Sequence, residues 1–322
     1  MLRTLLCDLL GIEIPIIQAG MSVLSSAELV AAVSNAGGLG SLGAWRRPPE
    51  NLSQQLSLIR ELTDKPFAVN FVVPEINEDS LNLALQAKPA VMSFALDDPG
   101  ENVRRAHDVG SLVVHQVTTV EQAYQAAERG VDVIIAQGSE SGGFGGSVAT
   151  LPLVPQVVDA VGPVPVVAAG GIADGRSLAA VLLLGAVGAN VGTRFLASLE
   201  SPISDDWKTM IVQAKSEDAI KFEALNTISP MPGTRGYGTV VRALRTEFID
   251  TWSDQIEEAG KQADELSGQL MAASQAGRLH ELLPAAGESA GLIKGVASAG
   301  EIVETMSEVA EQVLGQASKF VR

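Results

Sequence analysis

Residues 131–146 read V-D-V-I-I-A-Q-G-S-E-S-G-G-F-G-G, an apolar run that ends in an amide and passes into a segment with four glycines. Near-continuous apolarity over a short stretch is typical of a parallel strand that is covered on both faces. A segment with so few side chains suggests that a ligand lies close to the backbone. The stretch therefore predicts a buried parallel strand followed by a binding loop.

Runs of the same kind recur through the first 200 residues, and helix-length segments separate them. Eight evenly spaced strand–helix units predict a (β/α)8 TIM barrel, and an open doubly wound sheet is the second alternative. The expected strands are 14–21, 39–44, 67–73, 90–96, 111–117, 131–138, 165–171 and 189–195. The expected helices are 25–36, 50–63, 78–87, 101–109, 119–129, 152–161 and 174–184.

The pattern changes after Ser204. We expect no strand over 205–290 and three helices instead, at 206–219, 240–259 and 262–282. The segment 299–314 again has apolar residues at helical spacing and is expected to be the last outer helix. These observations predict a barrel made of residues 1–203 and 291–322, with a helical insert or lid made of residues 204–290.

Composition excludes several classes of protein. The chain has 22 basic and 38 acidic residues, a net charge of −16, which argues against binding to nucleic acid. Its apolar runs are too short to cross a bilayer, and Asp8 interrupts the apolar N-terminus, so we expect a cytoplasmic protein without a secretory leader or membrane segment. Cys7 is the only cysteine and no histidines have metal-ligand spacing, so no metal site is expected.

Functional groups of a parallel barrel collect where its strands end. Here those positions carry glycines, amides and hydroxyls with few charges, a set that suits an uncharged polar heterocycle with a phosphate. The candidates are Gly20, Met21, Ser22, Asn70, Gln137, Gly170, Gly171, Gly192 and Thr193. The glycines after the seventh and eighth strands would present backbone N–H groups to a phosphate, although either segment alone could simply form a tight turn.

The three histidines differ in setting. His107 lies in a polar helix and is expected to be solvated, and His280 is expected to be exposed or to cap a helix. His115 lies on an apolar strand. A core histidine bonded to the backbone is the commoner explanation for such a residue, and a catalytic base is the alternative.

Six motifs occur in a fixed order along the chain. They are I-P-I-I-Q-A-G-M-S (14–22), S-N-A-G-G-L-G-S-L-G (34–43), V-N-F (69–71), A-Q-G-S-E-S-G-G-F-G-G (136–146), V-V-A-A-G-G-I-A-D-G (166–175) and V-G-T-R-F (191–195). As a set they resemble the nitronate monooxygenase family, whose scaffold is shared by flavin-dependent enoyl-acyl-carrier-protein reductases of the second type and by some NADH:quinone reductases. The resemblance extends to the C-terminal G-E-S-A-G-L-I-K-G-V-A-S-A-G-E-I-V (287–303) and covers nearly the whole chain.

The resemblance implies an FMN cofactor. Gly20, Met21 and Ser22 would line the flavin ring, with Asn70 and Gln137 bonded toward it. Two further glycines, Gly142 and Gly143, would pass close to the cofactor. The phosphate would be held by Gly170, Gly171, Gly192 and Thr193.

One position departs from the family pattern. The family has E-A-G-G-H-x-G where this chain has E-S-G-G-F-G-G, so Phe144 replaces the histidine that is usually assigned to catalysis, and Ser141 replaces the alanine. A general base contributes roughly 10²–10⁴-fold to rate, and phenylalanine cannot act as one. His115 is a weak substitute, because its strand position is far from the loop.

Three functions follow from this departure. The first is oxidation of preformed anionic nitronates with dioxygen. The second is NAD(P)H-dependent reduction of an enoyl thioester or a quinone, and the third is flavin binding without catalysis. The candidate contacts to a small-molecule substrate are Phe144, Arg235 and Tyr237. The sequence is also compatible with a homodimer.

Overall fold

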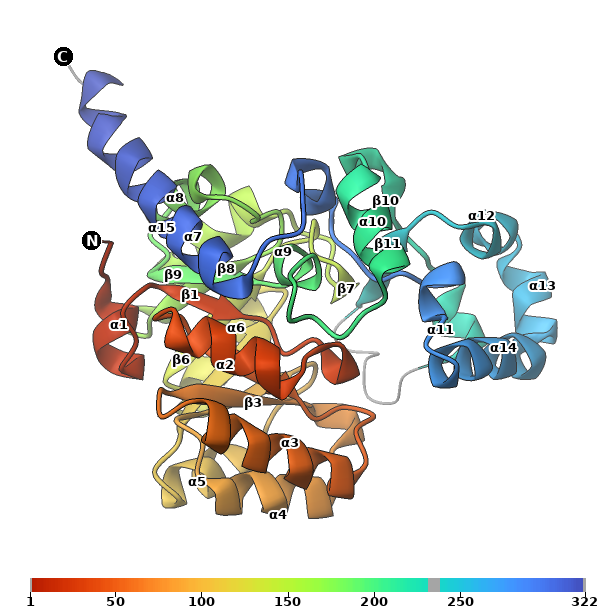
Figure 1. Ribbon diagram of the computed structural model, residues 1–322, viewed down its shortest axis with the longest axis horizontal. Helices are drawn as coiled ribbons and strands as arrows, with labels where there is room; N and C mark the ends of the chain where they lie inside the picture. The colour runs from red at the N-terminus through yellow and green to blue at the C-terminus, as the bar shows by residue number, and fades with distance from the viewer. Residues whose placement is uncertain (1, 231–237, 321–322) are drawn as a thin grey trace.

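The computed structural model describes residues 2–230 and 238–320 (Figure 1). Eight parallel strands form a ring in the order β1-β9-β8-β6-β5-β4-β3-β2, and a parallel bridge between Ile17 and Leu39 joins the last strand to the first. The strands are β1 (Ile16–Gln18), β2 (Gly40–Gly43), β3 (Phe67–Val72), β4 (Val91–Ala95), β5 (Leu112–Val117), β6 (Val133–Gln137), β8 (Val166–Ala169) and β9 (Gly188–Val191). The ring confirms the (β/α)8 barrel and a strand in each of the eight expected runs, although the run 189–195 ends as a strand at Val191 and continues into α9 (Thr193–Leu196).

Helices surround the ring, and side chains on alternate strand positions divide the core in two. The outer layer packs the helices on the sheet, and the inner layer fills the barrel. The helices are α2 (Ala27–Asn35), α3 (Pro49–Leu62), α4 (Glu78–Ala87), α5 (Asn102–Asp108), α6 (Val120–Glu128), α7 (Thr150–Val161), α8 (Gly175–Leu183) and α15 (Ala299–Gln316). As expected, α15 is the last outer helix, and it packs against both α8 and α2.

The N-terminal helix α1 (Leu5–Leu10) closes one end of the barrel. Leu6, Cys7 and Leu10 are buried in the same cluster as the inward side chains of the strands. In Figure 1, α1 and the insert lie at opposite ends of the ring, which leaves the carboxyl ends of the strands facing the insert. Cys7 is therefore a core residue.

The seam between β1 and β2 depends on a side chain. Gln18 is fully buried, and its Oε1 accepts a hydrogen bond from the backbone N–H of Ser41 at 2.9 Å. The Gln18 Nε2 donates to the carbonyl of Ala19. A side-chain amide thus supplements the single Ile17–Leu39 bridge where the ladder between these two strands is short.

The insert is not purely helical, and the prediction of no strand over 205–290 is wrong. β10 (Ala219–Lys221) and β11 (Val240–Leu244) pair antiparallel, and β11 pairs in turn with β7 (Gly143–Gly145). The partner β7 comes from the loop after β6, about 100 residues away along the chain, so no local pattern identifies the pairing.

The expected insert helices are correspondingly shorter. They are α10 (Asp205–Gln213), α11 (Leu225–Ile228), α12 (Glu247–Ser253), α13 (Ile256–Lys261) and α14 (Ala263–Gln275). The expected helix 240–259 begins only at Glu247 because the preceding residues form β11. The boundaries of the insert at 204 and 290 stay a prediction. No helix in the described ranges is both long enough and apolar enough to cross a bilayer.

We predict that Gln18→Met destabilises the barrel by about 1–3 kcal/mol, because it leaves the buried N–H of Ser41 without its acceptor. The measurement is the free energy of unfolding in urea. Gln156→Met is the matched control, since the Nε2 of Gln156 also bonds a backbone group, the carbonyl of Pro152 at 2.6 Å, but at an exposed position where water can replace the side chain. Equal losses in the two variants would contradict the role of Gln18.

Candidate functional site

Uncharged polar side chains line the mouth of the barrel. Asn70, Ser93, Gln116, Gln137 and Asn190 occupy the inward-facing register positions near the carboxyl ends of their strands, since the residues beside them belong to the outer layer. Four of them form two bonded pairs. Asn70 Nδ2 donates to Ser93 Oγ at 3.1 Å, and Gln116 Nε2 donates to Gln137 Oε1 at 2.9 Å. The mouth therefore offers amide and hydroxyl groups without a net charge.

Asn70 and Gln137 were predicted from the sequence, but their partners Ser93 and Gln116 were not. Ser93 lies two positions after the inward Val91, and Gln116 two positions after the inward Val114. Because strand side chains alternate between the two faces, this spacing of two was the available signal.

The end of the first strand lies against this polar group. A Cβ on Gly20 would stand 2.2 Å from Asn70 Cβ, so only glycine fits beside that amide. A Cβ on Gly192 would lie 3.7 Å from Met21 Sδ, which places β9 beside the Met21 thioether. The structure therefore brings Gly20, Met21, Asn70 and Gly192 together.

Ser22 is turned in another direction. Its hydroxyl donates to the carbonyl of Trp45 at 2.8 Å, and its own φ is 55°. A Cβ on Gly43 would be 2.4 Å from the Ser22 backbone nitrogen. Ser22 thus ties the loop after β1 to the loop after β2 and holds Trp45 in place.

The glycines after β8 form a bend between the strand and α8. Gly170 and Gly171 have φ values of 96° and 73°, which favour glycine. A Cβ on Gly170 would lie 2.8 Å from the carbonyl oxygen of Gly138, whereas one on Gly171 would meet no atom nearer than 3.6 Å, Glu140 Cβ. Close packing therefore accounts for Gly170, and Gly171 stands in a more open position.

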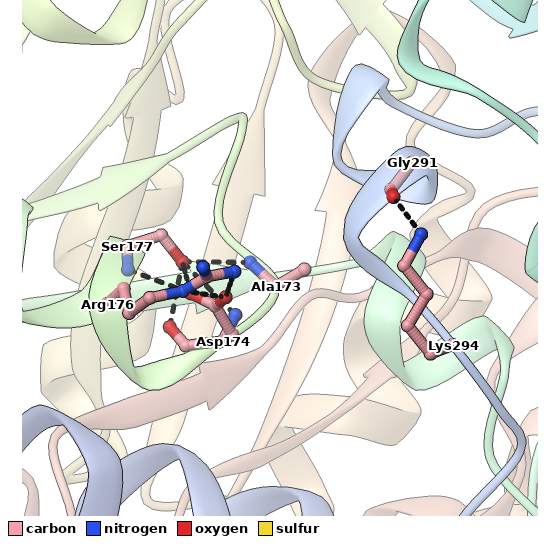
Figure 2. Close-up of polar contacts among 6 residues, drawn as sticks. All are labelled: Ala173, Asp174, Arg176, Ser177, Gly291 and Lys294. Atoms are coloured by element: carbon pink, nitrogen blue, oxygen red, sulfur yellow. Dashed lines mark hydrogen bonds and ion pairs between the residues drawn. The ribbon is translucent and has the colours of Figure 1, made fainter.

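α8 begins with a capping box, shown in Figure 2. The Asp174 carboxylate accepts the N–H of Ser177 at 2.9 Å, and Ser177 Oγ accepts the N–H groups of Ala173 and Asp174, each at 3.1 Å. Across from it, Lys294 Nζ donates to the carbonyl of Gly291 at 2.7 Å. Ala173 shares a cluster with Ile293, which sets this segment beside the start of α8.

Thr193, at the start of the short helix α9 (Thr193–Leu196), contacts the same C-terminal segment. Its Oγ1 accepts the N–H of Gly287 at 2.9 Å. A Cβ on Gly142 would stand 2.6 Å from the Gly287 nitrogen, so the glycine-rich segment packs directly on this segment. Gly142 is thus needed for contact between two protein segments. By contrast, Gly143 has a φ of 70° and no atom within 4 Å of a Cβ position.

Phe144 forms an apolar wall beside the mouth. It sits in β7 opposite Val241, and its ring meets Trp45 edge-on at 6.3 Å between centroids. It also packs with the cluster of Ala95 and Leu96 at the end of β4. The position at which the family pattern has histidine therefore lies against aromatic and aliphatic side chains.

Arg242 fixes the glycine-rich segment to the insert. The Nε and Nη2 of this buried arginine donate to the Ser139 carbonyl, at 3.2 and 2.9 Å, and Nη2 also pairs with Glu288 at 2.9 Å. The backbone N–H of Glu288 donates to the Glu140 carbonyl at 2.9 Å. Two segments around the mouth are thus held by one guanidinium.

His115 faces away from the mouth. It shares its strand face with Val113 and Val117 in the outer layer, is 1% exposed, and bonds through Nδ1 to the Phe94 carbonyl at 3.2 Å. Burial lowers the pKa of His115 to about 4, against smaller opposing effects of the Phe94 bond, Asp98 and Asp97. It is a core histidine and is not placed to act as a base at the barrel mouth.

Three further residues from the sequence predictions, His280, Arg235 and Tyr237, belong to the insert. His280 is buried and stacked on Trp207 of α10, with ring centroids 6.1 Å apart, so the expectation of an exposed side chain is wrong; its Nδ1 lies 3.4 Å from the Oγ of Ser204, the N-cap of that helix. Arg235 and Tyr237 lie outside the described residues. Within residues 2–230 and 238–320, no three His, Cys, Asp or Glu side chains are grouped so that they could hold a metal ion.

Comparisons with known proteins agree with the barrel fold. The nitronate monooxygenase family model matches residues 3–82 and 76–308. Thermotoga maritima FabK superposes with a TM-score of 0.91 at 35% identity over 100% of both chains.

Two curated relatives have different activities in their names. A Mycobacterium tuberculosis (3aS,4S,5R,7aS)-5-hydroxy-7a-methyl-1-oxo-octahydro-1H-indene-4-carboxyl-CoA dehydrogenase is 38% identical over 252 residues, 77% of this chain and 68% of the relative. A probable nitronate monooxygenase of Staphylococcus saprophyticus is 35% identical over 305 residues, 80% of this chain and 82% of the relative.

These matches, together with the (β/α)8 barrel, indicate a flavin-dependent oxidoreductase. Within that class, the chain belongs to the nitronate monooxygenase family.

The residues of the mouth fit a flavin. An isoalloxazine ring needs hydrogen-bonding groups along its polar edge and apolar contact on its faces; the Asn70 and Gln137 amides are groups of the first kind and the Met21 thioether is one of the second. The missing Cβ atoms of Gly171 and Gly192 leave backbone accessible at the ends of β8 and β9.

We predict that His115 makes stability depend on pH in the acid range. The unfolded histidine binds a proton near pH 6.5 and the folded one only near 4, so the folded state loses stability as pH falls through that window. The loss attributable to this group approaches roughly 3 kcal/mol at its lower end. Urea unfolding between pH 7.5 and 4 should show a shallower pH dependence for His115→Leu than for the unaltered chain, and identical slopes would contradict the assignment.

Proposed function

We propose that this protein is an FMN-dependent reductase of an unsaturated acyl thioester, with NAD(P)H as electron donor. In the net reaction, NAD(P)H and a proton reduce a carbon–carbon double bond to give NAD(P)⁺ and the saturated thioester. The observation that carries the proposal is Phe144, which stands against Trp45 and Leu96 where the family pattern has its histidine.

An apolar wall supports reduction over proton abstraction. A substrate with a carbon-bound proton to lose needs a base within hydrogen-bond reach, and Phe144 offers none. The described histidines do not replace it, because His115 points into the outer layer, His280 is covered by Trp207, and His107 is bonded to Asp132 at the end of α5 that precedes β5. An acyl chain, in contrast, gains free energy from apolar contact with Phe144 and Trp45.

FMN is the proposed cofactor because of the ends of β8 and β9. Gly171 and the Gly192–Thr193 start of α9 are neighbours across paired strands, and barrels commonly bind phosphate there. Thr193 Oγ1 already accepts the Gly287 N–H, so its hydroxyl hydrogen remains to donate to a phosphate oxygen. When bound, the flavin would supply two-electron transfer between the donor and the thioester.

One of the two curated relatives supports a thioester as the substrate class. The Mycobacterium tuberculosis relative is named as a dehydrogenase of a carboxyl-CoA compound, and a CoA ester is a thioester. We infer the same linkage here. The wall of Phe144, Trp45 and Leu96 is uncharged, so an acyl group needs no charge of its own to bind there.

Oxidation of an anionic nitronate with dioxygen is the second candidate. The family model and the Staphylococcus saprophyticus relative favour it. A preformed nitronate has already lost its proton, so Phe144 is compatible with this reaction too.

Anaerobic mixing tests the proposal. NADH or NADPH should bleach the flavin absorbance within the assay, and crotonyl-CoA should then restore it, whereas propyl-2-nitronate alone should leave the flavin oxidised. Bleaching by the nitronate and by neither nicotinamide would replace the proposal with the second candidate. A yellow preparation that responds to no substrate would indicate a flavin-binding protein without catalysis.

Phe144→His is the matched variant in the same assay. Histidine should add activity toward neutral nitroalkanes, which need a base, and leave reduction by NAD(P)H within about threefold, since a base contributes only where a proton is abstracted. Loss of nicotinamide-dependent reduction in this variant would place the residue in donor binding and contradict its role as an acyl-facing wall.

A further inference from the structure

A cavity of about 300 Å³ opens beside the barrel mouth, between the loops that follow β2 and β3. Its lining includes Trp45, Arg46, Arg47, Asn77 and Ser80. Trp45 belongs to both places, since its ring also meets Phe144 at 6.3 Å. A molecule in this cavity would therefore lie next to whatever occupies the mouth.

Two arginines give the cavity a positive character in a chain of net charge −16. The guanidinium of Arg46 stacks over the Trp45 ring, 4.5 Å from its centroid, and Arg46 is exposed. In the part of the chain that the structure describes, neither Arg46 nor Arg47 forms an ion pair with a carboxylate. One acidic residue, Glu75, lines the cavity, and its Oε2 is occupied by Trp45 Nε1 at 2.5 Å.

Arg47 and Arg46 have separate roles. Arg47 is buried and donates to the carbonyls of Gly43 and Ser25, at 2.9 and 2.7 Å, so it holds the loop. Arg46, with a φ of 56°, is left facing outward over the indole. The Arg46 backbone thus lies in the left-handed region, and its side chain lines the cavity.

A buried donor without a partner lies in the same cavity. Ser80 is 1% exposed, and its Oγ has no hydrogen-bond partner among the described residues. It stands in the first turn of α4, whose N-cap Asn77 also lines the cavity. An unpaired buried hydroxyl costs free energy unless a ligand completes its hydrogen bond.

We infer that this cavity binds a phosphorylated adenosine group. Guanidinium groups bind phosphate, while the Arg46–Trp45 stack offers a flat surface for a purine base. Coenzyme A and NADPH both carry such a group at the end remote from their reacting atoms. The inference rests on the proposed function, because it assigns the cavity to the remote end of that reaction's thioester carrier or of its electron donor.

Calorimetric titration of the full-length, flavin-loaded protein tests the assignment without turnover. The probes are adenosine 3′,5′-bisphosphate, which corresponds to the end of coenzyme A, and adenosine 2′,5′-bisphosphate, which corresponds to that of NADPH. We expect one of them to bind, and Arg46→Asn to weaken its affinity by about tenfold or more. Asparagine is used because it tolerates the positive φ.

Arg60→Asn is the matched control. Arg60 also places its guanidinium over an aromatic ring, 4.6 Å from the centroid of Phe67, but it lies outside the cavity. The affinity of the Arg60→Asn variant for both probes should equal that of the unaltered protein. Ser80→Ala provides a second variant that removes no existing hydrogen bond, and it should weaken binding severalfold without lowering the unfolding temperature.

The outcomes separate the two proposals. Binding of neither probe, or equal affinities in the Arg46, Ser80 and Arg60 variants, would overturn the assignment of the cavity even if the enzyme reduces thioesters. Arg46-dependent binding in a protein that reduces no thioester would refute the proposed function and keep the nucleotide site. Preference for the 3′,5′-bisphosphate assigns the cavity to the thioester carrier, and preference for the 2′,5′-bisphosphate assigns it to the donor.

Discussion

Closure of the parallel sheet is the constraint on which the rest of the structure depends. A parallel ring sends every strand's carboxyl end to the same mouth, and alternation along each strand then selects which side chains meet there. The ring is weakest between β1 and β2, where one backbone bridge is supplemented by the buried Gln18 amide. The seam completes the ring at whose mouth Asn70, Gln116 and Gln137, from three different strands, lie.

A second, antiparallel pairing determines what stands over this mouth. The glycine-rich segment after β6 becomes β7 and pairs with β11 of the insert, and Arg242 of β11 bonds back to Ser139 and Glu288. Phe144 is thereby held against Trp45. The absence of an ionisable side chain at this position is thus part of a packed arrangement that joins barrel and insert, in which a histidine would have to be accommodated among apolar groups.

Much of the barrel follows from local sequence pattern. The eight apolar runs and the intervening helices are periodic, so the ring and α15 could be predicted from single segments. The pairing of β7 with β11 depends on residues far apart in the chain, and the pattern of Val240–Leu244 does not distinguish a strand from the start of a helix.

The site was partly predictable for the same reason. Asn70 interrupts an apolar run and Gln137 ends one, so both stand out, whereas Ser93 and Gln116 become visible only once the inward register is known. The direction of His115 also required the register, and burial of His280 required its tertiary partner Trp207. Glycines look alike in sequence, yet Gly20 and Gly142 are set by close protein contacts and Gly143 is open.

The central claim is that the mouth, from Asn70 to the ends of β8 and β9, holds a flavin whose phosphate lies between Gly171 and Thr193. The most direct measurement compares the affinity of the flavin-free protein for FMN and for riboflavin, which differ only in that phosphate. The account predicts that FMN binds about a hundredfold more tightly or better, as expected for several hydrogen bonds to a charged group. Equal affinity for the two flavins, or no affinity for either, would contradict it.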